Sequence, residues 1–224
     1  MLTLNSAAQE QEFKRKPKRA DDFIRMEGLR LGVDLTRPFQ SMWTKGDRMG
    51  LAFSADVELV PNIFPVVEAG AESYKIDHDY INYNSSGGFV RLGLDYNLLE
   101  AQDPSERSTL YVGFRYGLSV STQQIESYTL NNYWETVSGA FHAQTYGAQW
   151  LEGVFGMTGE IMKNLYLGWS IRLKVNVYQG SKHDMPPASF NAGYGKTAKS
   201  RFDMTYSLYY TIPFKFHRPE KNAK

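Results

Sequence analysis

The residue types that most often carry catalysis occur in this sequence, but their spacing does not assemble an active site. Glu68 and Glu72 are two carboxylates four residues apart, the kind of pair that a general acid and a general base would need. Both fall in a strand-like segment that is dense in acids, which favours a structural role. Ser138 and His142 suggest a lipid hydrolase, but no acid at a recognisable spacing orients the histidine.

Motifs for metals and phosphates are equally weak. Among the histidines, which are His78, His142, His183 and His217, His78 has acids on both sides, in Asp77-His78-Asp79. One histidine between two acids is a weak metal motif. The segment Gly193-x-Gly195-Lys196 lacks the spacing of a phosphate-binding loop. We therefore expect no catalytic residue, no metal site and no cofactor.

The composition narrows the class of protein. The chain has 224 residues with 25 Lys+Arg and 24 Asp+Glu, and this near-balance argues against a nucleic-acid partner. It has no Cys, so disulfides, thiolate metal sites and cysteine nucleophiles are excluded. Its 4 Trp, 15 Tyr and 13 Phe make aromatic residues unusually dense. No apolar run approaches the roughly 18–20 residues of a transmembrane helix, which leaves open a membrane crossing made by strands.

From Glu27 onward the dominant period is two, as in strands with unlike faces. Eight segments alternate in this way: residues 28–36, 49–59, 66–74, 89–98, 110–120, 147–159, 165–177 and 201–216. The connections are short at 61–65 and 161–164, modest at 99–109, and long at 37–48, 75–88, 122–146 and 179–200. Short turns at one rim, long loops at the other and an even strand number are typical of an outer-membrane barrel.

The competing fold is a soluble barrel or sandwich, which also alternates. The distribution of glycine decides between them, because eight glycines fall on the polar face: Gly28, Gly32, Gly50, Gly70, Gly93, Gly113, Gly117 and Gly168. The apolar face is bulky and aromatic, whereas the polar face mixes small residues with charges. That arrangement suits a narrow lumen inside a wall that faces lipid. We predict an all-β fold, an eight-stranded antiparallel transmembrane up-and-down β-barrel.

In this predicted orientation, the polar face of each strand lines the lumen and the apolar face contacts lipid. The predicted charge network of the lumen comprises Arg30, Asp34, Asp56, Glu58, Glu68, Glu72, Arg91, Asp95, Arg115, Glu152, Arg172, Lys174 and Asp203. The predicted lipid-facing residues include Leu31, Val33, Leu51, Phe53, Leu92, Leu94, Phe114, Trp169, Ile171, Tyr206, Tyr210 and Phe214. Charges in so narrow an interior must pair or hold water, so we expect a network that plugs the barrel. A conducting pore is the alternative.

Residues 27–216 resemble the small outer-membrane β-barrel proteins of Bacteroidetes-type bacteria, a group with uncharacterised members. The most specific segment is Phe202-x-Met204-x-Tyr206-x-Leu208-x-Tyr210-x-Ile212-x-Phe214-x-Phe216. It is similar to the C-terminal signal that the barrel-assembly machinery of a Gram-negative envelope recognises. The chain departs from that signal by continuing for eight residues, 217–224. The resemblance implies a location in the outer membrane, with extracellular long loops and periplasmic termini.

The two ends of the chain carry separate expectations. Residues 1–8 end in Ser6-Ala7-Ala8, which resembles the remnant of a secretory signal peptide. Residues 9–26 contain a basic run and are predicted to be a periplasmic tail, either solvated or in contact with anionic headgroups. Residues 217–224 are predicted to form a second periplasmic tail, so that the barrel proper spans residues 27–216.

The long loop at 122–146 holds the aromatic residues that we expect to face a partner: Tyr128, Tyr133, Trp134, Phe141 and Tyr146. Exposed aromatics among amides are typical of protein-interaction surfaces, although the loop could also pack on itself over the barrel mouth. We expect a non-enzymatic structural or accessory subunit of an outer-membrane assembly for barrel insertion, secretion or surface-protein export. Its partners would be outer-membrane lipid and other outer-membrane or periplasmic proteins. The alternatives are a stand-alone adhesion or envelope-stabilising barrel, a lipid-modifying enzyme and a small channel.

Overall fold

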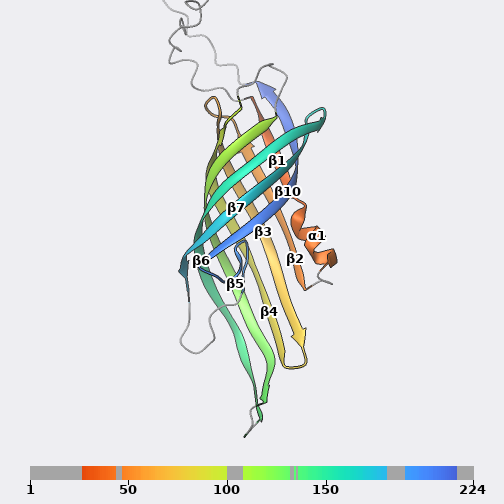
Figure 1. Cartoon of the computed structure of the whole chain (residues 1–224), viewed down its shortest axis with the longest axis vertical. Helices are drawn as coiled ribbons and strands as arrows, with labels where there is room; N and C mark the ends of the chain where they lie inside the picture. The colour runs from red at the N-terminus through yellow and green to blue at the C-terminus, as the bar shows by residue number, and fades with distance from the viewer. Residues whose placement is uncertain are drawn as a thin grey trace, which may run out of the picture.

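Eight antiparallel strands close into a barrel in the order β1-β10-β7-β6-β5-β4-β3-β2 (Figure 1). The computed structural model describes residues 27–43, 47–99, 108–131, 134, 136–180 and 190–215. The barrel strands are β1 (Glu27–Asp34), β2 (Arg48–Val57), β3 (Ile63–His78), β4 (Ile81–Asn97), β5 (Thr109–Asn131), β6 (Thr136–Met162), β7 (Leu165–Gln179) and β10 (Ser200–Lys215). The predicted all-β fold with a ring of eight antiparallel strands is confirmed.

The barrel has two unlike ends. We call one of them the turn end: it holds the start of β1, the end of β10 and the connections after β2, β4 and β6. The opposite end, the loop end, holds the connections after β1, β3, β5 and β7. Strands β3 to β6 run well past the others at the loop end, with β5 and β6 reaching farthest (Figure 1).

Two tight turns at the turn end share one design. Asn62 and Asn164 both take a positive φ, 68° and 65°, a conformation that asparagine tolerates better than most residues. The backbone N–H of Asn62 donates to Glu58 Oε1 at 3.0 Å, and the N–H of Asn164 donates to Glu160 Oε1 at 3.0 Å. Each glutamate therefore accepts a hydrogen bond from the turn N–H four residues later. The prediction that Glu58 belongs to the charge network is wrong, because its carboxylate stabilises this turn. The short connections predicted at 61–65 and 161–164 therefore lie where these turns form.

Two of the four predicted long loops are wrong. Residues 75–88 and 122–146 lie almost entirely in paired strands: β3 and β4 are joined through Asp79 and Tyr80, and β5 pairs with β6 as far as Asn131 and Thr136. Their polarity argued against strands, but many of the polar side chains there lie on the outer face, such as Lys75, Asn84 and Gln124, although Ser85 and Gln123 are buried inside.

The other two predicted loops hold short elements. Residues 36–43 form α1 (Thr36–Trp43), which begins where Asp34 Oδ1 accepts the N–H of Thr36 at 2.8 Å. Pro38 lies in its first turn, where a missing N–H costs no helical bond. Residues 190–196 form a hairpin of β8 (Phe190–Asn191) and β9 (Gly195–Lys196). No described helix is long and apolar enough to cross a membrane.

The polarity of the wall reverses partway along the strands. In the turn-end half, large apolar side chains such as Leu92, Phe114 and Leu173 are exposed outside, while charged side chains are buried inside. In the loop-end half, Lys75 and Gln124 are exposed outside, whereas an apolar cluster lies inside: Tyr83 and Ile125, with Tyr74, Ile76, Ile81, Tyr128 and Phe141 packed against them. A row of paired outward residues marks the change, and we call it the boundary row: Ala71, Gly88, Val120 and Gly147.

Candidate functional site

Glu68 is the centre of the barrel interior. It comes from β3, and its carboxylate meets arginines from three other strands. Arg91 Nη1 donates to Glu68 Oε2 at 2.5 Å, and Arg172 bonds both oxygens, at 2.8 and 3.0 Å. Arg115 Nε donates to Glu68 Oε1 at 3.4 Å. Since β3 and β7 are not neighbours in the ring, the bonds from Arg172 cross the lumen.

Two further carboxylates complete this central group. Asp95 accepts both terminal nitrogens of Arg115 at 2.7 Å, the bidentate geometry in which arginine and carboxylate pair most strongly. Glu152 lies between Arg91 and Arg172, at 3.1 and 3.3 Å, and accepts Trp150 Nε1 at 2.6 Å. All of these charged side chains are buried. The network therefore satisfies charges that burial would otherwise make very costly.

Other ion pairs extend the network toward both ends. Arg30 donates to Asp56 at 2.9 Å, and Lys174 donates to Asp203 at 2.7 Å. Glu72 pairs with Arg48 at 3.3 Å and also with Arg37, which reaches in from α1. Among the described residues, the ion pairs balance seven cations against seven anions: Arg30, Arg37, Arg48, Arg91, Arg115, Arg172 and Lys174 with Asp34, Asp56, Glu68, Glu72, Asp95, Glu152 and Asp203.

The β8–β9 hairpin enters the barrel from the loop end and is bound to this network at its tip. The carbonyl of Gly193 accepts Lys174 Nζ at 2.8 Å and Arg91 Nη2 at 3.2 Å, and its N–H donates to Glu72 Oε2 at 2.9 Å. The N–H of Ala192 donates to Ser121 Oγ at 3.1 Å. The backbone of the tip thus adds hydrogen bonds to Lys174, Arg91 and Glu72, which are also ion-paired within the network.

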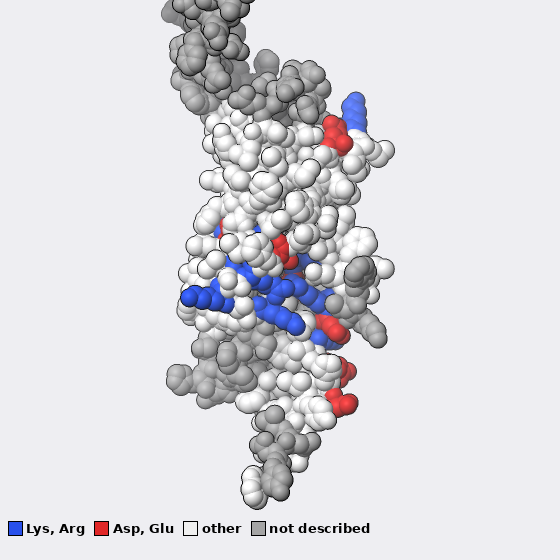
Figure 2. All heavy atoms as spheres, viewed as in Figure 1, with Lys and Arg blue, Asp and Glu red and all other residues white. Residues whose placement is uncertain are grey.

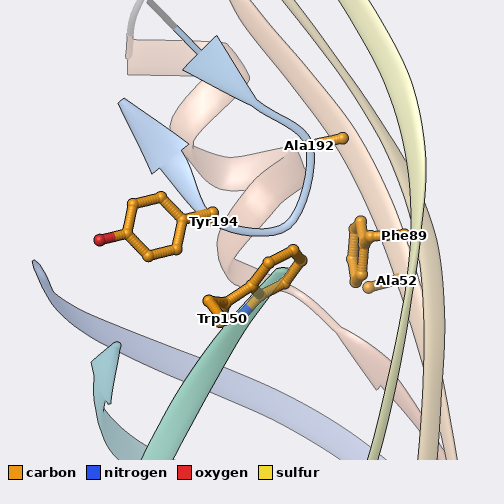
Figure 3. Packing of buried hydrophobic residues seen from close by; sticks show 5 residues of the cluster. All are labelled: Ala52, Phe89, Trp150, Ala192 and Tyr194. Atoms are coloured by element: carbon orange, nitrogen blue, oxygen red, sulfur yellow. The ribbon is translucent and has the colours of Figure 1, made fainter. Parts of the chain in front are cut away.

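Apolar packing holds the same hairpin in place. Figure 3 shows Ala192 and Tyr194 on the hairpin turn, beside Trp150 of β6 and close to Phe89 and Ala52 of the wall. Tyr194 is 1% exposed, and its ring meets the Trp150 ring edge-on with centroids 5.9 Å apart. We call residues 190–196 the plug, because they fill the lumen at the loop end. Toward the turn end, Tyr111, Tyr166 and Tyr209 are buried inside the barrel.

Gly193 suits this position for two reasons. Its φ is +79°, which strains residues with a side chain, and an added Cβ would stand 2.5 Å from Cγ of Phe89. We examined this glycine in the sequence only as part of a phosphate loop and missed the plug. The available signal was the pair of aromatic residues Phe190 and Tyr194 within a polar connection.

The structure places the predicted lumen residues on the inner face of the wall, except Glu58, which lies beyond β2 and accepts the turn N–H of Asn62. Asp34, Asp56, Glu68, Glu72, Arg91, Asp95, Arg115, Glu152, Arg172 and Lys174 are buried, and Arg30, Glu58 and Asp203 are partly buried. Residues 75–88 and 122–146 were set aside as loops, so their inward aromatics were missed. Arg37 and Arg48 were also missed, because they belonged to a segment predicted to be a loop.

The predicted lipid-facing residues lie on the outer face. Leu31, Leu51, Phe53, Leu92, Leu94, Phe114, Tyr206 and Tyr210 are exposed, and Val33, Trp169 and Ile171 are partly exposed. Phe214 lies in β10, but its side chain is not among those described. On the face shown in Figure 2, a broad zone without charged side chains separates the charges near the turn end from a band of Lys and Arg.

The predicted partner-facing aromatics do not form one exposed group. Tyr146 is a correction: it is buried, and its hydroxyl donates to the carbonyl of Phe190 in the plug. Tyr128 and Phe141 stack on each other across β5 and β6 with centroids 5.5 Å apart. Trp134 is 91% exposed, and Tyr133 lies outside the described residues. Residues 1–26 and 217–224, with their predicted signal and tail roles, also lie outside them.

The carboxylates of the site take part in ion pairs. Glu68 and Glu72 each bond their own arginines, which leaves neither placed as a free acid or base. His78, His142 and Ser138 are exposed, and His183 and His217 are outside the described residues. Within the described part of the chain, no group of three or more His, Asp or Glu residues could hold a metal ion.

Comparison with known proteins adds one match. A family model described as "Domain of unknown function (DUF6048)" matches residues 1–217. A comparison with curated proteins finds no match.

Proposed function

The chain belongs to the DUF6048 family, and from that premise we propose that it spans a bacterial outer membrane as a closed, plugged barrel. In this proposal it is a non-enzymatic structural or accessory subunit of a larger outer-membrane assembly. The loop end would face the outside of the cell, and both termini would lie in the periplasm.

The reversal of wall polarity at the boundary row carries the proposal. A soluble barrel would bury apolar residues along its whole length and present polar residues to water. Here the turn-end half exposes residues such as Phe53, Leu94 and Phe114 and buries charges. The loop-end half does the opposite, with Lys75 outside and Tyr83 inside. One sheet with two opposite polarities fits a wall that leaves lipid and enters water.

The apolar zone has a suitable height. Outward apolar and aromatic residues of β10 run from Phe202 to Ile212, ten residue steps along the strand. At about 3.3 Å per residue and a tilt of about 40°, that length covers roughly 25 Å of membrane, the usual height of the apolar band on such barrels.

The filled interior favours a closed barrel over a channel. Ion pairs cross the lumen at Glu68 and Arg172, and the plug fills it nearer the loop end. An eight-stranded barrel has an interior about wide enough for its own side chains. What remains available to other molecules is the outer wall and the projecting loop-end half of β3 to β6.

A charge placed on the apolar zone tests the membrane assignment. We expect Leu94→Arg to lower the free energy of unfolding in lipid vesicles by about 2–4 kcal/mol, because arginine near the membrane midplane is costly. Asn84→Arg, outward on the same strand beyond the boundary row, is the matched control and should cost less than about 1 kcal/mol. Urea titration followed by electrophoretic mobility measures both. Equal stability of the two variants would contradict a lipid-facing wall.

The subunit role has a separate test. The tips of the projecting strands expose Trp134 and Tyr80, residue types that are common in protein interfaces. We expect the chain to co-purify from membranes in mild detergent with another envelope protein at a fixed stoichiometry, which native mass spectrometry measures. Trp134→Ala should reduce the amount of that partner that co-purifies. His142→Ala, at an exposed position on β6, should leave that amount unchanged. A lone monomer under these conditions would contradict the subunit role.

A further inference from the structure

The outer wall contains an apolar groove at the boundary row. It has a volume of about 690 Å³, within the range of roughly 300–1,000 Å³ typical of small-ligand sites. Gly88 and Gly147, which we call its floor, are among the residues that line it, as are the larger side chains Val90, Leu118, Val120 and Tyr178. Gln149 is held at one side, where its Oε1 accepts the hydroxyl of Tyr116 at 2.8 Å.

The groove exists because Gly88 and Gly147 have no side chains, although the surrounding space would accommodate one at each position. A Cβ added at Gly88 or Gly147 would meet nothing closer than 3.7 Å, an ordinary contact distance. Neither glycine has a positive φ. Most other glycines of the wall differ, because a Cβ at Gly113 or Gly117 would overlap neighbouring atoms. The floor of the groove is therefore open to an apolar group from outside the chain.

The surroundings of the groove match an amphiphile. On the turn-end side it is continuous with the exposed apolar wall at Leu92 and Tyr116. On the loop-end side, the next outward row is made of hydroxyl residues: Ser73, Ser86, Thr122 and Thr145, with Thr122 and Thr145 bonded to each other at 2.9 Å. Lys75 is exposed one outward position farther along β3. The outer face thus changes over a few residues from apolar side chains to hydroxyl side chains, and then to a row that holds Lys75 beside Asn84 and Gln124.

We propose that this groove binds one acyl chain of an anionic membrane lipid, with the headgroup against the hydroxyl row and Lys75. The inference rests on the proposed membrane location and deepens it by naming a lipid site. Tyr178 at the groove supports the placement, because tyrosine is enriched where a membrane meets water. The chain then holds that lipid in one position and orientation, unlike the lipids around the rest of the wall.

The experiment fills the groove with added side chains and measures how many lipid molecules the protein retains. The full chain is inserted into vesicles of equal phosphatidylglycerol and phosphatidylcholine, extracted in mild detergent and analysed by native mass spectrometry. We expect the natural sequence to retain one phosphatidylglycerol, and Gly88→Leu/Gly147→Leu to retain at least tenfold less. Gly153→Leu is the matched control, because it is an outward glycine of β6 with no atom within 4 Å of an added Cβ. Lys75→Gln should abolish the preference for the anionic lipid.

The outcomes separate the two proposals. If the natural sequence fails to insert, judged by carbonate extraction, the membrane assignment fails and the lipid site fails with it. If all variants insert and retain lipid equally, the groove proposal alone is overturned. If the double variant, purified from cell membranes, lost a co-purifying protein while its lipid retention in vesicles was unchanged, the occupant would be a protein and the groove proposal would also be overturned. Should the double variant not insert, Gly88→Leu alone carries the same test.

Discussion

Replacing Glu68 by glutamine is expected to be among the most damaging single changes in the barrel. The amide keeps the shape of the carboxylate but removes the charge that Arg91, Arg115 and Arg172 share. Removing one partner of a buried ion pair costs about 3–5 kcal/mol, because the remaining charge is left buried and uncompensated. We expect Glu68→Gln to lower the free energy of unfolding by this amount, measured by urea titration of the protein in vesicles.

A carboxylate outside the lumen provides the control for this prediction. Glu126 is exposed on β5, so Glu126→Gln should change the free energy of unfolding by less than about 0.5 kcal/mol. Adding Arg172→Met to Glu68→Gln should recover part of the loss, since one uncompensated charge is then removed as well. If Glu68→Gln were as stable as the natural sequence, the central network would not be what holds the interior together.

Replacing Gly193 by valine is expected to expel the plug. A side chain in the left-handed conformation costs roughly 1–2 kcal/mol, and the overlap with Phe89 adds about 1–3 kcal/mol. When the tip leaves, Lys174 and Arg91 lose the carbonyl that they bond at 2.8 and 3.2 Å. The hairpin should then become accessible to chymotrypsin at Phe190 and Tyr194, which are both 1% exposed in the native structure.

Limited proteolysis of the folded barrel measures this effect. Lys199→Val is the control, because Lys199 lies in the same connection but is exposed, and it should leave the cleavage pattern unchanged. We expect the barrel strands of Gly193→Val to stay intact while the plug is cut. Protection of Phe190 and Tyr194 in the valine variant would show that the plug does not depend on the close approach of Gly193 to Phe89.

The period-two pattern of the sequence predicted eight antiparallel strands and divided each into two faces, and the glycines on the polar face indicated which face would be inside. It worked because alternation is local: neighbouring residues of a strand point to opposite sides whatever the rest of the chain does. The same local signal located the tight turns near Asn62 and Asn164. It failed at residues 75–88 and 122–146, since the apolar residues move to the inner face there and the outer face becomes polar.

Only the tertiary structure decided which charges meet and what closes the lumen. Glu68 and Arg172 are 104 residues apart and lie on strands that are not neighbours, so their contact depends on how the ring closes. The plug likewise depends on a cavity that exists only after the strands have paired, with Tyr146 and Trp150 turned inward to receive it. Sequence alone thus determined the two faces of the wall, because side-chain direction is a property of each strand. Closure and register determined the contents of the barrel, because those contacts join residues that are distant in the chain.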